Sequence, residues 1–515
     1  MARLSVNGVE VEVANGATLL DAAQRAGAEV PTLCYLRETG AITSCMVCIV
    51  KDQVSGQMLP ACSAKAADGM LIDTDGEEVR AARREVLQML LSEHVGDCEG
   101  PCSRICPAGL NIPRMLRYIA ADNPDAAAWV AKRDLVFPAT LGRLCTAPCE
   151  KGCRRAAYDA PIAIRRLHRE AGERVLRDGL EKSGTVTHFL PDSLPPGQRT
   201  QTQQIGNCPP FSPATGKTVA VVGGGIAGLS AAWICLLKGH VCRVYEKQAL
   251  ACASLRSLPQ EQLSQEVLDA EIGSVRDLGA KFVSGCQIGR DISLDSLRAE
   301  FDAVIVACDL VSSRDSGVFT AQEDAMPVRA VAHGKAAAQQ ADAFLHGLPC
   351  DGIPRRFNSR IGRLRPEEMA PYAVERLDRT ANAQAETNAP DAEAGRCLHC
   401  DCVKPASCRL KRYAREYGLS SRVERHMKRP PVEPIQRFDD VLFEPGKCIK
   451  CGICVEITQA AGSDLGLTFV GRGLAAGVRV PFGEPLARGL GEVALQCVRS
   501  CPTGALAFRN EEETG

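Results

Sequence analysis

Valines alternate with polar residues on both sides of Asn7-Gly8, at Val6, Val9, Val11 and Val13. A period of two is typical of β-strands, and Asn-Gly is a strong signal for the two-residue turn of a hairpin. Thr18, with Asp21 three residues later, forms a capping-box-like pair at which we expect a short helix to begin. A hairpin followed by a helix is therefore predicted at the start of residues 1–78.

Two longer patterns follow. We expect a helix from Arg80 to His94, and an apolar run extends from Val219 to Leu237. The second run is long enough to resemble a membrane span. Its glycines at 223–225 instead fit a strand, a phosphate-binding loop and a helix, so we predict no membrane span. Residues 181–216 lack periodicity and are predicted to form a linker or a surface-hugging loop, and residues 351–395, of low hydrophobicity, are predicted to form a polar connector.

Length and charge limit the function classes. A chain of 515 residues exceeds what one hydrophobic core normally serves, so we expect roughly three to five domains. Lys and Arg total 61 against 62 Asp and Glu, and the aromatic residues include only 2 Trp and 7 Tyr. Because such a chain has neither a global basic field nor base-stacking platforms, we expect no nucleic-acid partner.

Cysteine is the outlier of the composition, with 26 in the chain, most of them clustered. The N-terminus has no apolar segment of the signal-peptide type, so we expect a cytoplasmic, reducing location. Clustered cysteines there bind metal more often than they form disulfides. Five cysteines that lack ligand spacing are predicted as core residues: Cys235, Cys242, Cys252, Cys286 and Cys308.

Between His94 and His168, six cysteines fall in two groups: Cys98, Cys102 and Cys106, then Cys145, Cys149 and Cys153. Two groups in one compact helical segment indicate two metal centres. A Cys-Pro pair such as Cys106-Pro107 typically belongs to a different iron-sulfur cluster from the run before it. We therefore expect iron-sulfur clusters, with structural zinc as the alternative.

The C-terminal region contains two further groups. Three cysteines at ferredoxin spacing and a remote Cys-Pro cysteine complete one 4Fe-4S site: Cys448, Cys451, Cys454 and Cys501. Cys497 has no partners left and is not assigned. The group Cys397, Cys400, Cys402 and Cys408 has the spacing for either zinc or a 4Fe-4S cluster, and the iron-sulfur setting favours the cluster.

The segment from Lys217 predicts a strand, the loop Gly223-x-Gly225-x-x-Gly228, a helix and a second strand that ends at Glu246. Glycines at these positions let the backbone approach a pyrophosphate at the helix N-terminus, and the acid accepts a ribose hydroxyl. We therefore expect a dinucleotide-binding fold in residues 217–350.

Both ends of the chain resemble one group of proteins. The array Cys34, Cys45, Cys48 and Cys62 resembles the 2Fe-2S ferredoxin-like domain of the large iron-sulfur subunit of respiratory complex I and of NAD-linked hydrogenases. The C-terminal interval with GLTFVGRG resembles a cluster region of the same subunits. Met46 stands where many relatives carry Arg, a departure that concerns the cluster's hydrogen bonding rather than its ligation.

The central segments CSRICPAGLNIP, FPATLGRLCTAPCEKGC and APIAIRRLHRE are similar to the double-cluster domain of the glutamate synthase small subunit and its dihydropyrimidine dehydrogenase relatives. That resemblance implies one 4Fe-4S cluster on Cys98, Cys102 and Cys153 and another on Cys106, Cys145 and Cys149. Each set is one ligand short, and position implies His94 for the first and His168 for the second.

The nucleotide segment resembles the FAD half of the same family, which implies FAD contacts at Glu246 and Glu323. Relatives insert a second Rossmann unit for NAD(P)H, but here Phe301–Asp309 is followed almost at once by the segment that returns to FAD. We therefore expect no NAD(P)H site in this chain. Ala251-Cys252 and Gln322-Glu323 replace a glycine pair and a Gly-Asp pair, which leaves two hypotheses: a bound FAD or an empty fold kept as a scaffold.

The predicted architecture is multidomain, α+β and α/β. It comprises a β-grasp 2Fe-2S domain (1–78), an α-helical double 4Fe-4S domain (79–180), a truncated Rossmann-like FAD domain (217–350) and a C-terminal ferredoxin-like 4Fe-4S region (396–515). If every site is filled, the chain holds one 2Fe-2S and four 4Fe-4S clusters.

No residue set resembles a substrate-activating site, so we expect an oxidoreductase subunit that acts as an electron relay. The resemblance implies an NADH-oxidising FMN iron-sulfur subunit and a catalytic hydrogenase or formate dehydrogenase subunit as partners, with ferredoxin-linked electron bifurcation left open. The alternatives are a self-contained FAD-dependent NAD(P)H oxidoreductase of the glutamate synthase small-subunit type and a zinc-stabilised scaffold.

Overall fold

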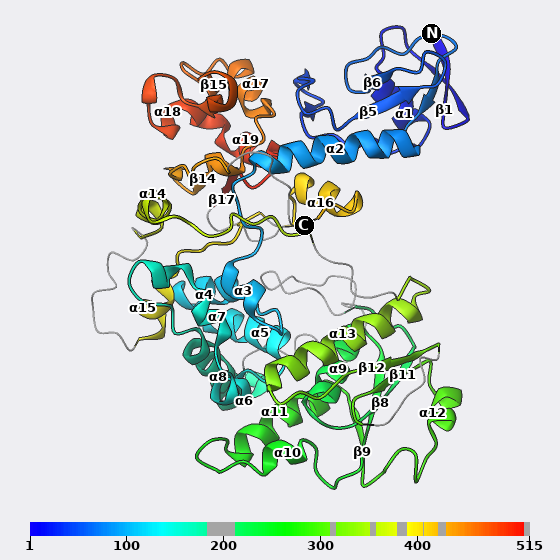
Figure 1. Cartoon of the computed structure of the whole chain (residues 1–515), viewed down its shortest axis with the longest axis vertical. Coiled ribbons are helices and arrows are strands. Elements are labelled where there is room, and N and C mark those ends of the chain that lie inside the picture. Colours follow the sequence, from blue (N-terminus) through cyan, green and yellow to red (C-terminus); the bar gives the residue numbers. More distant parts are fainter. Residues whose placement is uncertain are drawn as a thin grey trace. The chain divides into compact units, whose positions relative to one another are not determined.

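The computed structural model describes residues 1–182, 212–309, 316–350, 357–377, 389–404, 406–420 and 429–508 (Figure 1). Most of the predicted linker 181–216 and part of the predicted connector 351–395 lie outside these residues. The chain forms two compact units. The first comprises Met1–Glu99, Arg356–Asp378 and Asp401–Gly515, and the second comprises Gly100–Arg355 and Arg379–Cys400.

The first unit begins with a five-stranded sheet in the order β2-β1-β7-β5-β6. Its strands are β1 (Ala2–Val6), β2 (Val9–Val13), β5 (Ile49–Asp52), β6 (Met58–Pro60) and β7 (Leu71–Asp73), and a small pair, β3 (Tyr35–Leu36) and β4 (Gly40–Ala41), lies apart. The predicted hairpin is confirmed, because Val6 pairs with Val9 across Asn7 and Gly8, whose φ angles are 52° and 83°. The helix start is confirmed as well, since Thr18 and Asp21 form a capping box on α1 (Leu19–Arg25).

Helix α2 (Glu77–Glu93) connects this sheet to the C-terminal segment of the same unit. It begins three residues before the predicted helix and ends just before His94. Its buried Leu87 and Leu91 share one hydrophobic core with Phe443 and Ile453. Buried Arg83 donates to the Ile49 carbonyl at 3.0 Å and to the Tyr417 hydroxyl at 2.9 Å, so the helix is fixed on both sides.

The C-terminal segment contains a three-stranded antiparallel sheet, β13-β14-β17, and several short helices. Its elements are β13 (Gln436–Phe438), β14 (Val441–Phe443), β15 (Thr468–Val470), β16 (Gly477–Arg479), β17 (Leu506–Phe508), α16 (Arg409–Glu416), α17 (Ile453–Ala460), α18 (Leu486–Leu490) and α19 (Ala494–Ser500). The predicted connector includes α14 (Pro366–Leu377) and α15 (Pro390–Gly395). Both helices begin at a proline, a residue that suits the first helical turn.

The second unit begins with short helices around the central cysteines: α3 (Pro101–Ile105), α4 (Ile112–Ala120), α5 (Pro124–Leu135), α6 (Pro138–Leu144), α7 (Pro148–Lys151) and α8 (Ile164–Lys182). A parallel sheet follows, in the order β10-β9-β8-β11-β12. Its strands are β8 (Thr218–Val222), β9 (Val241–Glu246), β10 (Lys281–Ser284), β11 (Ala303–Val306) and β12 (Val318–Thr320).

The helices around this sheet are α9 (Ile226–Leu237), α10 (Ala253–Arg256), α11 (Gln265–Asp277), α12 (Leu294–Glu300) and α13 (Pro327–Leu345), and α9 packs against α13 (Figure 1). The strand, loop, helix and strand predicted from Lys217 are confirmed as β8, α9 and β9. Cys235, Cys242 and Cys252 are buried as predicted, and Cys286 is partly buried. Cys308 is exposed, contrary to the prediction, because it follows the end of β11. In the part of the chain that the structure describes, no helix has the length and apolar character needed to cross a membrane.

A buried carboxylate attaches the parallel-sheet region, residues 212–350, to the helices around the central cysteines within the second unit. Glu271 on α11 accepts the N–H groups of Ala139 and Thr140 at 2.9 and 2.8 Å, at the N-terminus of α6, where a negative charge is favourable. Burial lowers the pKa of nearby Lys132 to about 8, and the charge of Glu271 opposes this shift. The Lys132 ammonium also lies 5.0 Å from the centre of the Trp233 ring.

Replacing Glu271 with Gln should destabilise the second unit. The amide offers one acceptor to two buried N–H groups and leaves Lys132 without a counter-charge, so we expect a loss of roughly 2–4 kcal/mol. For a unit of this size, that loss lowers the thermal midpoint by at least about 4 °C in calorimetry of the full chain. Glu266→Gln changes an exposed residue of the same helix and should leave the midpoint in place. If both variants had the same thermal midpoint, the conclusion that Glu271 stabilises the second unit would be wrong.

Candidate metal centres and dinucleotide loop

The four cysteines predicted to hold a 2Fe-2S cluster are brought together and buried in the first unit: Cys34, Cys45, Cys48 and Cys62. The Cys34 sulfur accepts the N–H of Cys45 at 3.4 Å. Hydrogen bonding to the Cys34 thiol raises the pKa of Cys45 and of Cys62, and burial acts in the same direction. Thiols this close together in a buried loop fit binding to one small cluster.

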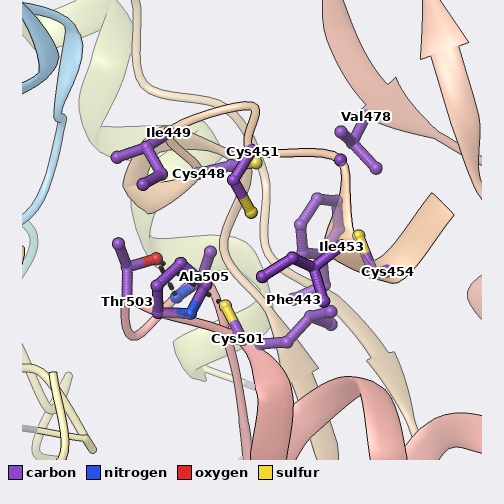
Figure 2. A pocket seen from close by; sticks show the side chains of 13 residues that line it. Phe443, Cys448, Ile449, Cys451, Ile453, Cys454, Val478, Cys501, Thr503 and Ala505 are labelled. Atoms are coloured by element: carbon purple, nitrogen blue, oxygen red, sulfur yellow. Dashed lines mark hydrogen bonds between the residues drawn. The ribbon is translucent and has the colours of Figure 1, made fainter. Parts of the chain in front are cut away.

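The C-terminal ligands line one apolar pocket in the first unit (Figure 2). Its four sulfurs belong to Cys448, Cys451, Cys454 and Cys501, and the apolar side chains around them include Phe443, Ile453 and Val478. The Lys450 N–H donates to the Cys448 sulfur at 3.3 Å, and Lys450 has a left-handed φ of 55°. Burial raises the pKa of Cys448 to about 12. The residues fit a cluster that takes one thiolate from each cysteine.

The 2Fe-2S loop and the C-terminal pocket are neighbours, which the sequence did not predict. The Ser44 hydroxyl donates to the Cys451 carbonyl at 3.3 Å, and Cys34, Cys45 and Cys451 belong to the same hydrophobic core. Cys497, left unassigned from the sequence, is buried with its sulfur 4.0 Å from the Cys454 carbonyl oxygen.

A second pocket, in the second unit, is lined by all four residues implied as ligands of one central cluster: Cys106, Cys145, Cys149 and His168. The Cys145 sulfur accepts the Ala147 N–H at 3.4 Å, and Ala147 has a left-handed φ of 51°. His168 is buried, and burial lowers its pKa to about 4, so the ring is neutral. Its Nδ1 lies 3.2 Å from the Pro138 carbonyl oxygen, the arrangement that leaves Nε2 available to a metal.

The remaining predicted ligands are divided between the units. His94, Cys98, Cys402 and Cys408 belong to the first unit, whereas Cys102, Cys153, Cys397 and Cys400 belong to the second. Among the described residues, no three His, Cys, Asp or Glu side chains are placed to hold a single metal ion.

The glycine loop before α9 is tightly packed, and both predicted cofactor-binding acids bond to it. A Glu323 carboxylate oxygen accepts the Ala227 N–H at 2.9 Å, in the first turn of α9. The Glu246 carboxylate accepts the N–H groups of Gly224 and Gln248 at 2.6 and 2.8 Å. Burial raises the pKa of Glu323, and the charge of Glu246 adds to the shift.

The position of Glu323 bears on cofactor binding. A dinucleotide pyrophosphate binds at the helix N-terminus through the same N–H groups and the same positive end of the helix dipole. A Cβ added to Gly225 would stand 2.1 Å from the Glu323 carboxylate, so the Glu323 side chain occupies the space that a side chain at position 225 would need. In this arrangement the loop residues do not fit a dinucleotide, and no electron-transfer step is assigned to a flavin.

Three segments match protein-family models. Residues 1–77 match the 2Fe-2S iron-sulfur cluster binding domain, and residues 79–179 match dihydropyrimidine dehydrogenase domain II, 4Fe-4S cluster. Residues 221–272 match the NAD(P)-binding Rossmann-like domain. The resemblance to iron-sulfur oxidoreductases inferred from the cysteine patterns is thereby confirmed.

Similar curated proteins are subunits of oxidoreductases. The NADP(+)-dependent formate dehydrogenase subunit beta of Moorella thermoacetica is 30% identical over 219 residues, 42% of this chain and 30% of the relative. The NAD-dependent dihydropyrimidine dehydrogenase subunit PreT of Escherichia coli K12 is 32% identical over 224 residues, 43% of this chain and 48% of the relative. The glutamate synthase [NADPH] small chain of Mycobacterium tuberculosis is 32% identical over 213 residues, 41% of this chain and 38% of the relative.

The chain thus spans between 30% and 48% of the length of these relatives. Among solved structures, it aligns over its whole length with 90% of a chain of an NAD+-reducing [NiFe]-hydrogenase, at 13% identity and a TM-score of 0.33, too low to carry an argument. The chain is a multidomain protein with 2Fe-2S, 4Fe-4S and Rossmann-like domains, similar to subunits of iron-sulfur oxidoreductases.

Proposed function

We propose that this chain is an iron-sulfur electron-transfer subunit of a multi-subunit, NAD-linked oxidoreductase. The observation that carries the proposal is that two predicted ligand sets, each of four residues, line two separate apolar pockets. Clusters bound there supply one-electron chemistry, at a potential set by ligand type, hydrogen bonds to sulfur and burial. The protein's part is to hold the ligands, exclude water and place charges around them.

Buried cations lie beside the C-terminal pocket. The Lys404 ammonium donates to the carbonyl oxygens of Val498 and Cys501 at 2.6 and 3.2 Å. Lys447 is also buried and is paired with Glu444 at 2.6 Å. Because a reduced cluster carries more negative charge, a nearby buried cation favours the reduced state and raises the potential of the site.

The 2Fe-2S loop and the C-terminal pocket lie next to each other, which supports a relay in which these two sites exchange electrons directly. The Ser44 to Cys451 hydrogen bond fixes the two loops against each other. The partners we propose are an NADH-oxidising FMN iron-sulfur subunit and a catalytic hydrogenase or formate dehydrogenase subunit. If the complex bifurcates electrons, ferredoxin is a further electron acceptor. The name of the Moorella relative, a formate dehydrogenase subunit, supports the second partner.

A second candidate is a self-contained, FAD-dependent NAD(P)H oxidoreductase. The match of residues 221–272 to an NAD(P)-binding Rossmann-like domain favours it. Against it, the described part of residues 212–350 forms one parallel sheet, and Glu323 occupies the dinucleotide position of its loop. The same geometry favours the scaffold hypothesis over a bound FAD.

The isolated chain should not oxidise NADH or NADPH. After anaerobic purification, dithionite should bleach its iron-sulfur absorbance, whereas NADH and NADPH, with an artificial dye as acceptor, should give only the background rate. Adding the flavoprotein partner should make NADH an effective reductant. Rapid NAD(P)H oxidation by the chain alone would instead establish the second candidate.

His168→Ala should remove or alter one 4Fe-4S signal in electron paramagnetic resonance and leave the 2Fe-2S signal intact. The buried ring is neutral and its Nε2 is the nitrogen left for iron, so its loss leaves a cluster with three ligands. His346→Ala removes an exposed histidine at the end of α13 and should change neither signal. Unchanged spectra and iron content in His168→Ala would refute its ligation.

Glu323→Asp should increase the affinity for FAD. The shorter side chain withdraws the carboxylate from the α9 N-terminus, where a competing negative charge is worth roughly 0.3–2 kcal/mol, a change of about 2-fold to 30-fold in affinity. Fluorescence titration with FAD measures the difference. Glu300→Asp shortens an exposed glutamate elsewhere and serves as the control. A wild-type chain that purifies with stoichiometric FAD would contradict the scaffold hypothesis.

A further inference from the structure

Two runs of predicted cysteine ligands begin in one unit and end in the other: the central run that starts at Cys98 and the run from Cys397 to Cys408. The first passage lies between Glu99 and Gly100, so Cys98 and Cys102 belong to different units. The second lies between Cys400 and Asp401, so Cys400 and Cys402 are divided in the same way. Each run therefore contributes ligands to both units, and the contacts within each unit indicate which residues share a site.

In the first unit, the backbone of Cys98 is held between two segments that are distant in sequence. Its N–H donates to the Ser359 carbonyl at 3.2 Å, and its sulfur accepts the Ser359 N–H at 3.4 Å. Its own carbonyl accepts the N–H of Cys402 at 3.3 Å. Cys98 and Cys402 are thus adjacent, although about 300 residues separate them in the sequence.

Cys408 completes a group of three thiols with these two. Its sulfur accepts the Lys411 N–H at 3.4 Å at the start of α16. The Leu410 N–H, two residues after Cys408, donates to the Pro502 carbonyl at 3.4 Å. A Cβ added to Gly504 would stand 2.3 Å from the Cys402 sulfur, so Cys408 and Cys402 both lie beside the turn at residues 502–504.

His94 lies beside the same group through the buried Lys447 side chain. A Cβ added to Gly96 would stand 3.0 Å from Nε2 of His94 and 2.7 Å from Cγ of Lys447. A Cβ added to Gly504 would stand 2.3 Å from the Cys402 sulfur and 3.9 Å from Cδ of Lys447. The imidazole and the Cys402 thiol therefore both lie close to this one lysine.

In the second unit, the loop from Cys397 to Cys400 repeats the turn of the ferredoxin-spaced loop. The Cys397 sulfur accepts the His399 N–H at 3.4 Å, and His399 has a left-handed φ of 45°. In the C-terminal pocket, Lys450 makes the same bond to Cys448 at 3.3 Å with a φ of 55°. A CxxC loop in this conformation is shaped to present two sulfurs on one side.

Cys153 is connected to this loop through Arg155. Arg155, two residues on, donates to the Arg396 carbonyl at 2.8 Å, immediately before Cys397. Cys102 comes from α3, which packs against α7 just ahead of Cys153.

We propose that the eight divided ligands form two separate 4Fe-4S centres, His94, Cys98, Cys402 and Cys408 in the first unit and Cys102, Cys153, Cys397 and Cys400 in the second. The assignment rests on the proposed function, because it takes clusters as the bound groups. It gives each centre four ligands, and it supplies from the C-terminal run the cysteines that the central run lacks.

Pairwise alanine variants of the full chain, purified anaerobically, test the grouping through iron and acid-labile sulfide per chain. Cys153→Ala with Cys400→Ala, and Cys98→Ala with Cys402→Ala, each remove ligands of one centre and should lose about four irons, no more than either single variant. Cys400→Ala with Cys402→Ala, and Cys98→Ala with Cys153→Ala, each affect both centres and should lose about eight. Cys286→Ala, outside every site, should lose none.

If the ligands were instead grouped by sequence run, Cys400 and Cys402 would share one cluster and Cys98 and Cys153 another, so the expected iron losses would be reversed. A loss of about four irons from each of those two pairs would overturn the assignment. The 2Fe-2S signal of each variant reports that the chain has folded. Should a double variant lose that signal, single Cys→Ser variants give the same grouping, since residues of one centre must alter the same paramagnetic signal. Zinc without acid-labile sulfide in the wild-type chain would refute the proposed function itself, an outcome separate from a wrong grouping.

Discussion

A hydrogen bond from a backbone N–H to the cysteine sulfur two residues earlier shapes three of the cysteine loops. It joins Ala147 to Cys145, His399 to Cys397 and Lys450 to Cys448. In each loop the donor residue is left-handed, which costs a residue other than glycine roughly 1–2 kcal/mol. The loops persist because the surrounding structure holds them, and a thiolate bound to iron would accept a stronger bond than a neutral thiol.

Burial of the thiols sets the second constraint. Burial raises the pKa of Cys149, Cys408 and Cys448 to about 12 in each case, so without metal these groups are neutral at pH 7. Iron binding requires their deprotonation and therefore couples to the packing around them. The buried Lys404 ammonium reduces the cost of the negative charge that results, whereas the charge of Lys447 is balanced by Glu444. The C-terminal segment thus combines apolar walls with a fixed positive charge.

Local patterns in the sequence predicted local structure well. The Asn7-Gly8 hairpin, the Thr18 capping box and the strand, loop and helix around Gly223 all occur where their residues indicate. The resemblance of the N-terminal and central segments was likewise detectable from the cysteines together with the residues and elements around them. What spacing could not give is which cysteines share a site, because the chain changes unit within both runs. The left-handed turns were also hidden, since Ala, His and Lys carry no signal for that conformation.

The glycine loop shows how the fold itself can require the glycines of a dinucleotide motif. A Cβ on Gly223 would stand 2.4 Å from the Ala307 carbonyl oxygen, and one on Gly228 would stand 1.9 Å from the Gly223 carbonyl oxygen. A Cβ on Gly225 would meet the Glu323 carboxylate. Gly223 and Gly228 are therefore required by the backbone packing of this chain on itself, whether or not a pyrophosphate binds, whereas Gly225 faces the flexible end of the Glu323 side chain. Their presence supports the Rossmann-like fold, whereas ligand binding depends on the residues that face the helix N-terminus, and here that position is taken by a carboxylate of the protein.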